Sequence, residues 1–282
     1  MAAPSALFPA RLLSMRPIRR VLMETGQWAL FIGQTLWYLP LTVRRYYRQT
    51  LQAMNSLAWG RGSIIVDGGT ISVLILLGIA VGASVAIEGF AILDLIGFGA
   101  LAGIIGGVGT VREIGPLVAG IAYTSQAGCR MTAEIGAMRI SDEIDAVEAI
   151  GLRPIPFVVG TRLIGGLLVV IPGYLLTLVA AFFVQNVFIT ALYNQPSGTY
   201  SHYLAMFLTP TDLAYSVIKA AVFCIAVTLI HCYYGYFTSG GPVGVGKASG
   251  RAVRASLVTV MVLDFTLTVA LWGLQPQFVF RG

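Results

Sequence analysis

The chain has 282 residues, of which 57% are hydrophobic and only 11% are Asp, Glu, Lys or Arg. Soluble domains average about 25% charged residues, so this composition excludes an ordinary soluble protein. The net charge of +6 would suit nucleic acid, but the basic residues lie at the ends of apolar runs, as the positive-inside rule describes for membrane proteins. The sequence therefore predicts an all-α membrane protein that binds no nucleic acid.

Cysteine and histidine are too sparse to predict a metal centre. Cys129, Cys224 and Cys232 lie in or beside apolar runs without the spacing of metal ligands, which favours free packed thiols. His202 and His231 are too far apart in sequence to suggest a zinc site. No nucleophile and base form a recognisable local motif. We expect no metal, no cofactor and no enzymatic activity in this chain.

Residues 1–58 form a basic N-terminal region that contains an apolar stretch at 27–43. Polar residues and Pro40 interrupt this stretch, and no small-residue cleavage site follows it, which argues against a signal peptide. Tryptophan and tyrosine residues around it favour a headgroup boundary. We predict that 20–58 forms helices lying in the cytoplasmic interface. The alternative is that 27–43 crosses the membrane as a sixth span.

Residues 59–282 contain five apolar runs that are long enough to cross a bilayer, which takes about 20 residues. The predicted spans cover about 64–87, 98–126, 157–187, 213–237 and 255–274. Small residues recur at short intervals in and beside the first two spans, a pattern that lets membrane helices approach closely. The glycines expected at such contacts are Gly78, Gly82, Gly89, Gly99 and Gly103.

The distribution of basic residues predicts the orientation, because cytoplasmic segments carry the excess of Lys and Arg. A cytoplasmic N-terminus leaves Arg281 alone on the external side, and five spans then place the C-terminus outside. We expect a multi-pass protein of the plasma (inner) membrane. The residues assigned to the cytoplasmic side are Arg11, Arg16, Arg19, Arg20, Arg44, Arg45, Arg48, Arg61, Arg130, Arg139, Arg153, Lys247, Arg251 and Arg254.

A charged segment, 127–155, separates the second and third spans. Ser141 is a suitable N-cap for a helix that Gly151 stops. Acidic residues follow in its first turn, where the helix dipole favours negative charge. An apolar stripe of Ile140, Ile144, Val147 and Ile150 accompanies Asp142, Glu143 and Asp145. The pattern fits a solvated surface helix or a helix on which a soluble partner docks, and leaves both open.

Four ionisable residues fall within the predicted spans, where charge is costly: Arg112, Glu113, Lys219 and Asp264. Arg112 and Glu113 could neutralise one another locally at a helix break, or face a cavity or a partner subunit. Lys219 and Asp264 could form a structural salt bridge between neighbouring spans. They could also form the ion relay of a secondary transporter.

The segment Gly241–Ser249 nearly matches the phosphate-binding loop G-x-x-x-x-G-K-[ST]. It lacks the hydroxyl that holds magnesium, because Ala248 stands there, and it follows a membrane span instead of a strand. We therefore predict a flexible loop over 238–254. If a nucleotide drives this protein, another subunit binds it.

Three motifs in the central part of the chain resemble the MlaE/YrbE permease family. They are Arg112-Glu113-Ile114-Gly115-Pro116, Thr132-Ala133-Glu134-Ile135-Gly136-Ala137-Met138-Arg139, and Asp142-Glu143-Ile144-Asp145-Ala146-Val147-Glu148. Closer to the end, 231–236 and 240–246 resemble the B-type YrbE permeases of mycobacterial and related actinobacterial Mce systems. The motifs occur in the order of the family and cover about 60–275.

The resemblance implies a fold and a function. The fold is a set of N-terminal interfacial helices followed by a permease domain with five membrane helices and a cytoplasmic coupling helix. The function is that of a permease subunit in an ABC transporter that imports lipids. The implied partners are an A-type YrbE paralogue, a cytoplasmic ATPase dimer that uses ATP, and MCE-domain proteins outside.

The resemblance also assigns roles to residues. ATPase coupling would fall to Glu134, Arg139, Asp142, Glu143, Ile144, Asp145, Val147 and Glu148. The glycines named above would border a lipid cavity between two permeases. Two other hypotheses are an ion- or proton-coupled secondary transporter that uses Lys219 and Asp264, and a membrane scaffold that transports nothing.

Overall fold

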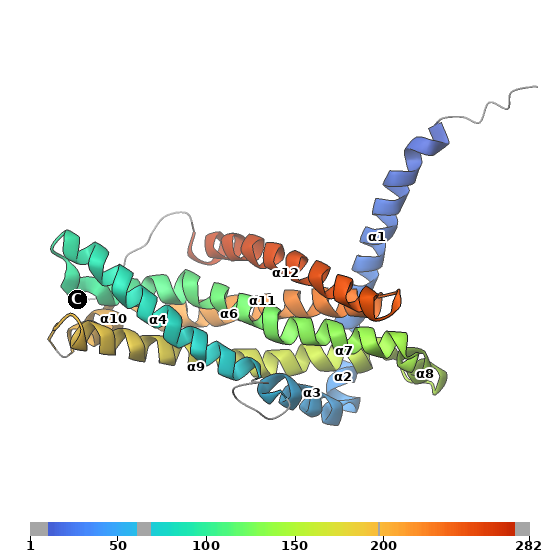
Figure 1. Cartoon of the computed structure of the whole chain (residues 1–282), viewed down its shortest axis with the longest axis horizontal. Coiled ribbons are helices and arrows are strands. Elements are labelled where there is room, and N and C mark those ends of the chain that lie inside the picture. Colours follow the sequence, from blue (N-terminus) through green and yellow to red (C-terminus); the bar gives the residue numbers. More distant parts are fainter. Residues whose placement is uncertain (1–10, 61–68, 197, 274–282) are drawn as a thin grey trace, which may run out of the picture.

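The computed structural model describes residues 11–60, 69–196 and 198–273, and within these ranges all regular structure is helical. Five helical segments within the described residues are long and apolar enough to cross a membrane, which confirms the expected all-α membrane architecture. These segments are Thr70–Leu95, Gly99–Ile140, Pro156–Ala191, Pro210–Tyr236 and Gly241–Trp272. They pack lengthwise into one elongated bundle (Figure 1).

The N-terminal region consists of α1 (Arg11–Trp37), α2 (Leu39–Arg45) and α3 (Tyr47–Trp59). Figure 1 shows α1 leaving the bundle at a steep angle, while α2 and α3 lie against the bundle's flank. The break after Trp37 divides the apolar stretch 27–43 between two helices, which argues against a sixth span there. The expected helices over 20–58 are therefore confirmed, and their place in the membrane interface stays a prediction.

The first and third spans are α4 (Thr70–Leu95) and α9 (Thr161–Ala191), and α9 is preceded by a π-helical turn, η4 (Pro156–Gly160). A Cβ on Gly78 would lie 2.5 Å from the Thr177 carbonyl oxygen, and one on Gly82 would lie 2.6 Å from that of Ala181. The two backbones thus touch where only glycine fits, as the small-residue spacing predicted. Residues 64–68 of the predicted span lie outside the described residues, and α4 continues past 87 to Leu95.

The second span is a continuous run of short helical segments. These are η1 (Gly99–Leu101), α5 (Ala102–Ile104), η2 (Ile105–Ile114), α6 (Gly115–Tyr123), η3 (Thr124–Gly128) and α7 (Cys129–Ile140). The segments η2 and η3 are π-helical. This conformation is rare in proteins, and where it occurs it is often found at functional sites. The helical run extends beyond 126, the predicted end of the span. Helix continues to Ile140 because ion pairs within the protein satisfy the polar residues of α7.

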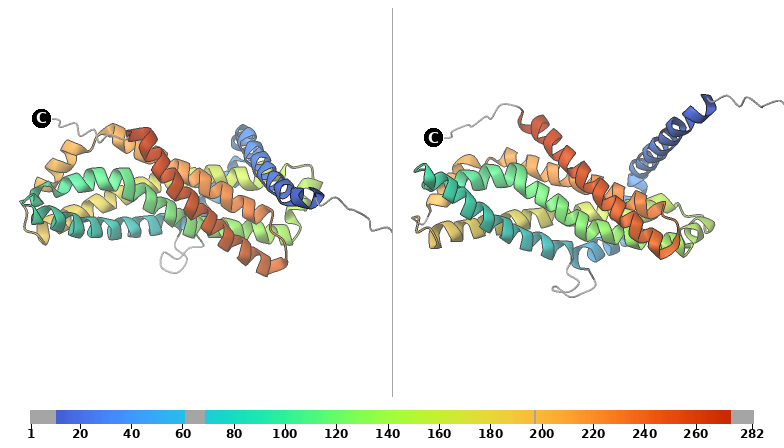
Figure 2. Two further views of the ribbon diagram at one scale, coloured as in Figure 1. Left: turned by 90° about the horizontal axis from the view of Figure 1, so that it is seen from above. Right: turned by 45° about the horizontal axis from the view of Figure 1, so that its top comes forward.

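The last three helices are α10 (Thr199–Phe207), α11 (Pro210–Tyr236) and α12 (Gly241–Trp272), and α12 crosses the bundle obliquely (Figure 2). The predicted flexible loop over 238–254 was wrong, because α12 already begins at Gly241. Gly240 turns the chain with a left-handed φ of 89°, and Pro242 lies in the first helical turn, where its missing N–H costs nothing. The small residues Ala248 and Ala252 are buried against the bundle.

Candidate functional site

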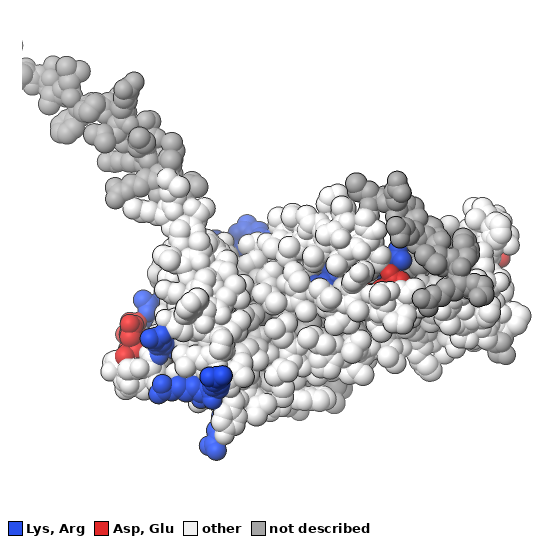
Figure 3. Space-filling view, turned by 180° about the vertical axis from the view of Figure 1, so that it is seen from behind, with Lys and Arg blue, Asp and Glu red and all other residues white. Residues whose placement is uncertain are grey.

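Charged side chains gather at two places on the bundle. Figure 3 shows flanks almost free of charge, a group of acidic and basic residues at one end, and a few charged atoms set into the flank. The first place lies around α8 (Glu143–Ala149), the short helix that follows α7. We call that end of the bundle the α8 end. The second is a group of residues inside the bundle, which we call the buried charge cluster.

The N-cap of α8 lies one residue later than predicted. Its N-cap is Asp142, in a left-handed conformation with φ 56°, which aspartate tolerates better than most residues. Ser141 was expected to be the N-cap, but it ends α7, with Oγ 3.0 Å from the Ala137 carbonyl oxygen. The tight turn between two separate helices explains the error. The end near Gly151 was predicted correctly, and its φ is 79°.

The apolar stripe of this segment divides into two parts. Ile144 is 1% exposed and packs in the main core, and Val147 is partly buried. Ile140 and Ile150 are 40% and 73% exposed, because the turn at Asp142 breaks the helical period that the prediction assumed. Ile144 thus anchors α8 to the bundle, and the other two isoleucines flank an exposed surface.

That surface is acidic. The side chains of Asp142, Glu143, Asp145 and Glu148 are all exposed on or beside α8. Arg139 Nη1 donates to Asp145 Oδ1 over 2.6 Å, a surface ion pair that contributes little stability but orients α8 against α7. Four carboxylates against one guanidinium leave a surface that suits a basic partner.

Glu134 was expected in the same coupling set, but it lies apart from α8. Its carboxylate accepts from Arg130 Nε over 2.9 Å and from Arg162 Nη2 over 3.3 Å. Arg130 also donates to the Ser56 carbonyl oxygen over 2.9 Å. Glu134 therefore braces α3, α7 and α9 together at the α8 end.

The buried charge cluster is centred on Lys219, whose side chain is 0% exposed. Its ammonium donates to the Arg112 carbonyl oxygen (2.8 Å), Glu113 Oε2 (3.2 Å) and Thr268 Oγ1 (2.7 Å), which matches all three of its protons. Asp264 Oδ1 lies 2.8 Å from the same nitrogen, so the suggested ion pair with Asp264 is confirmed. One cation joins η2, α11 and α12.

A second ion pair extends the cluster toward the end of α12. Arg112 Nη2 lies 3.0 Å from Asp212 Oδ1, and Trp272 Nε1 donates to the same oxygen over 2.6 Å. The suggested local pair of Arg112 with Glu113 was wrong, since each binds a different residue of α11. Asp212 and Trp272 were not predicted, because both stand at helix ends and look like ordinary boundary residues.

The cluster holds three carboxylates and two cations, so its formal charge is −1 when all are ionised. Glu113 opens it to the surface, since its side chain is 43% exposed, while Asp264 and Asp212 are mostly covered. Buried ion pairs recover their desolvation cost only in good geometry. The cluster therefore favours one arrangement of η2, α11 and α12.

The remaining predicted glycines also lie at contacts within the chain. A Cβ on Gly89 would lie 3.2 Å from Ile105 Cδ1, and one on Gly99 would lie 2.8 Å from Asp94 Oδ1. On Gly103 it would lie 2.7 Å from the Tyr200 carbonyl oxygen. All three therefore lie at close contacts within the chain, and the lipid cavity stays a prediction.

A buried polar chain fixes α10 to the span beside it. Tyr200 Oη donates to Gln185 Oε1 over 2.6 Å, and Gln185 Nε2 donates to Thr110 Oγ1 over 3.0 Å. Burial raises the pKa of Tyr200, so its hydroxyl keeps the proton that it donates. No local sequence pattern pointed to this connection, because its members lie far apart along the chain.

Comparison with known proteins places the chain in a family. The family described as "Permease MlaE" matches residues 62–270. A probable ABC transporter permease of Rickettsia prowazekii is 29% identical over 169 residues, which cover 56% of this chain and 61% of that protein. A probable ABC transporter permease of Synechocystis is 29% identical over 58% of this chain and 64% of its own length.

A plant protein extends the comparison. The chloroplastic protein TRIGALACTOSYLDIACYLGLYCEROL 1 of Arabidopsis thaliana is 28% identical over 171 residues, which cover 61% of this chain and 47% of that protein. In each of these comparisons the chain spans less than two thirds of the relative. The family match, in contrast, covers most of this chain. The chain is therefore a multi-pass membrane protein of the MlaE permease family.

Proposed function

We propose that this protein is a permease subunit of an ABC transporter that moves lipids across the plasma (inner) membrane. The observation that carries the proposal is α8, an acidic helix anchored by Ile144 at one end of five apolar spans. Two relatives are named as probable ABC transporter permeases, and the name of a third is that of a diacylglycerol lipid. ATP would be used by separate ATPase subunits, with no cofactor in this chain.

The α8 end is the side on which we place the ATPase, and therefore the cytoplasm. Exposed Arg44, Arg45 and Arg48 lie on α2 and α3, and Arg153 contacts Tyr38 with its Cζ 4.6 Å from the ring centroid. Basic residues thus lie on α2 and α3 and just after α8, as the positive-inside rule describes for the cytoplasmic side. With five spans, the end of α12 then lies on the external side.

Coupling follows from how α8 is held. A basic partner surface would bind the four carboxylates, while Ile140 and Ile150 supply apolar contact beside them. Because Ile144 lies in the core and Arg139 ties α8 to α7, a displacement of α8 moves α7 as well. Glu134 passes that movement to α9 and α3 through Arg162 and Arg130.

The cargo would lie between two permeases, with an A-type YrbE paralogue as the second. Lipid is held by apolar area, worth about 25 cal/mol per Å², so closing an apolar cavity expels it without any bond being made. MCE-domain proteins would continue the path outside the membrane, and import is the direction implied by the resemblance to Mce systems.

The alternative of an ion- or proton-coupled transporter rests on the buried charge cluster. Lys219 already has all three protons donated to acceptors within the chain, an arrangement that favours a structural role. Transport that continues without ATPase and stops when the proton gradient collapses would establish this alternative.

Gentle detergent purification of the tagged chain from its native membrane, followed by mass spectrometry, tests the proposal. We expect a second permease, an ATPase, MCE proteins and lipid to co-purify. Recovery of the chain alone, in a preparation where other membrane complexes survive, would contradict the proposed assembly.

A further inference from the structure

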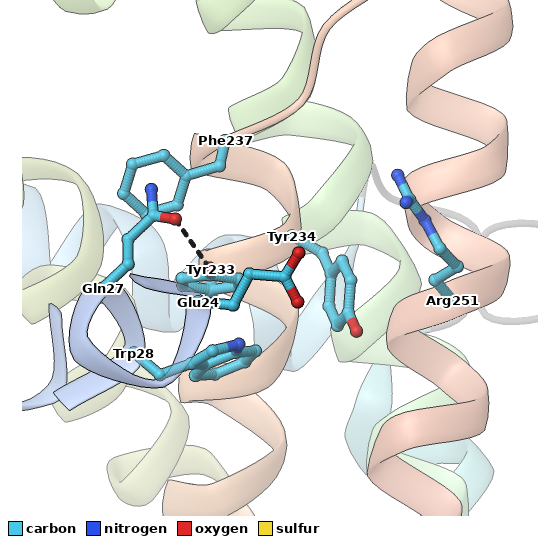
Figure 4. Close-up of a pocket in the computed structure, with 7 residues that line it drawn as sticks. All are labelled: Glu24, Gln27, Trp28, Tyr233, Tyr234, Phe237 and Arg251. Atoms are coloured by element: carbon cyan, nitrogen blue, oxygen red, sulfur yellow. Dashed lines mark hydrogen bonds between the residues drawn. The ribbon is translucent and has the colours of Figure 1, made fainter. Parts of the chain in front are cut away.

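A pocket of about 300 Å³ lies between α1, α11 and α12, separate from the surfaces described above. Figure 4 shows side chains from all three helices pointing into it. Its volume is at the small end of the roughly 300–1,000 Å³ typical of ligand pockets, so it has room for a headgroup and none for acyl chains. The lining residues are Glu24, Gln27, Trp28, Tyr233, Tyr234, Phe237 and Arg251.

The aromatic wall of this pocket is preformed. Trp28 stacks on Tyr233 with ring centroids 3.6 Å apart, and Phe237 packs against Tyr233 with centroids 4.9 Å apart. Tyr233 Oη donates to Gln27 Oε1 over 3.2 Å, which holds α1 against α11. These contacts fix the positions of the rings that line the cavity.

Opposite charges border the same cavity. In Figure 4 the ring of Tyr234 lies between the carboxylate of Glu24 and the guanidinium of Arg251. Arg251 Cζ is 5.7 Å from the Tyr234 ring centroid. A guanidinium and a carboxylate thus lie on opposite sides of one aromatic ring.

The depth of the pocket indicates where its ligand comes from. The 32 residues of α12 extend about 48 Å at about 1.5 Å per residue, well beyond a hydrocarbon core of about 30 Å. Its apolar part follows Arg254, so Arg251 lies near the level of the headgroups. Tyr233 and Tyr234, near the end of α11, belong to the same layer, where tyrosine is enriched.

We propose that this pocket binds the zwitterionic headgroup of an aminophospholipid. The phosphate would pair with the guanidinium of Arg251, which is suited to phosphate oxygens. The ammonium would lie beside Glu24 and the face of Tyr234, where a carboxylate and an aromatic ring both attract a cation. An anionic headgroup would meet Glu24, and a simple amine would meet Arg251, so a headgroup with both charges fits best.

The site is distinct from the proposed cargo cavity, and its occupation does not depend on transport. A bound lipid would bridge α1 and α12, which lie on opposite sides of the pocket (Figure 4). Its acyl chains would remain in the bilayer. The ligand would therefore be a resident lipid of the leaflet at the α8 end.

Native mass spectrometry of the delipidated transporter complex tests this proposal, with phosphatidylethanolamine and phosphatidylglycerol of identical acyl chains as probes. We expect phosphatidylethanolamine to bind more tightly. Arg251→Gln should weaken its binding about tenfold, the scale of one hydrogen bond to a charged group. Glu24→Gln should remove the preference for phosphatidylethanolamine while phosphatidylglycerol still binds.

Arg254→Gln is the matched control, because Arg254 lies one turn further along α12, donates to the Gly250 carbonyl oxygen and does not line the pocket. Equal lipid binding by the Arg251→Gln and Arg254→Gln variants would overturn the proposal. So would a preference that survives Glu24→Gln, since the ligand would then be recognised by phosphate alone.

Soluble glycerophosphoethanolamine carries the same phosphodiester and ammonium charges as the lipid headgroup, so it tests whether the ligand is a lipid or a free metabolite. We expect it to compete with the lipid only weakly, because it lacks the chains that keep a lipid at the membrane. Binding as tight as that of the lipid would overturn the assignment to a membrane ligand. A thermal unfolding scan of each variant confirms that the protein compared is folded.

Discussion

Lys219 Nζ lies 2.8 Å from Asp264 Oδ1 and 3.2 Å from Glu113 Oε2, so one buried ammonium joins three segments of the bundle. Replacing Lys219 by Met would leave two carboxylates facing one another without their cation. Breaking a buried ion pair in this way costs about 3–5 kcal/mol. We expect a clear fall in the thermal unfolding midpoint of the purified protein.

The double variant Lys219→Met with Asp264→Asn is the control for this prediction. Asp264→Asn removes the mostly buried carboxylate and leaves only the partly exposed Glu113 without its cation, so stability should recover in part. If the single variant is as stable as the unchanged protein, the cluster does not hold the bundle together in the way its geometry indicates.

Gly82 provides a test of the close contact between α4 and α9. A Cβ at this position would lie 2.6 Å from the Ala181 carbonyl oxygen, so Gly82→Ala must push the two helices apart. Overpacking of this kind costs about 1–3 kcal/mol, measurable by thermal unfolding. Gly246→Ala in α12 is the matched control, since a Cβ there has nothing within 4 Å and alanine favours helix. Equal effects of the two substitutions would contradict the described packing.

Ile144 and Ile150 allow anchoring and docking to be separated. Ile144→Ala should destabilise the protein by about 2–5 kcal/mol, the usual cost for a buried isoleucine. Ile150→Ala should leave unfolding unchanged, because that side chain is already 73% exposed. It should instead lower the amount of ATPase that co-purifies. Loss of stability in the Ile150 variant alone would reverse the roles assigned to them.

Glu134→Gln tests the brace at the α8 end. The substitution removes the charge that Arg130 and Arg162 share, and we expect a loss of about 1–3 kcal/mol for the unpaired groups. Glu148→Gln removes an exposed carboxylate of the same type and should change the free energy of unfolding little. A Glu134 variant with unchanged stability and reduced ATPase binding would place Glu134 on the docking surface instead.

Much of the fold could be predicted from the sequence because membrane spans are governed by local composition. Apolar runs and small-residue spacing predicted five spans and the contacts of Gly78 and Gly82. The sequence did not show that polar residues continue a helix, as in α7, and it wrongly predicted a loop where a glycine-rich segment is helical, at the start of α12. In both cases packing within the chain, through ion pairs or buried alanines, overrides local propensity.

For the candidate site, the sequence predicted which residues take part better than it predicted which residues they contact. The acidic helix and four members of the buried charge cluster, Arg112, Glu113, Lys219 and Asp264, were identified from their type and position. Their partners were not, because Arg112 pairs with Asp212 and Tyr200 with Gln185 across helices that only the folded chain brings together. A pattern along one chain segment does not contain such contacts, which explains why Arg112 and Glu113 were considered as a local pair.

The measurement that tests the central claim most directly is charge reversal on α8. The variant Glu143→Lys with Asp145→Lys is purified with its partners, and ATP-driven lipid movement and ATPase recovery are compared with the unchanged complex. Glu88 is an exposed carboxylate near the end of α4 that lies away from the α8 end. The variant Glu88→Lys is therefore the control for ATPase recovery. We predict loss of ATP-driven lipid movement with an unchanged unfolding midpoint. Normal ATP-driven lipid movement by a folded α8 variant would contradict the coupling role of α8.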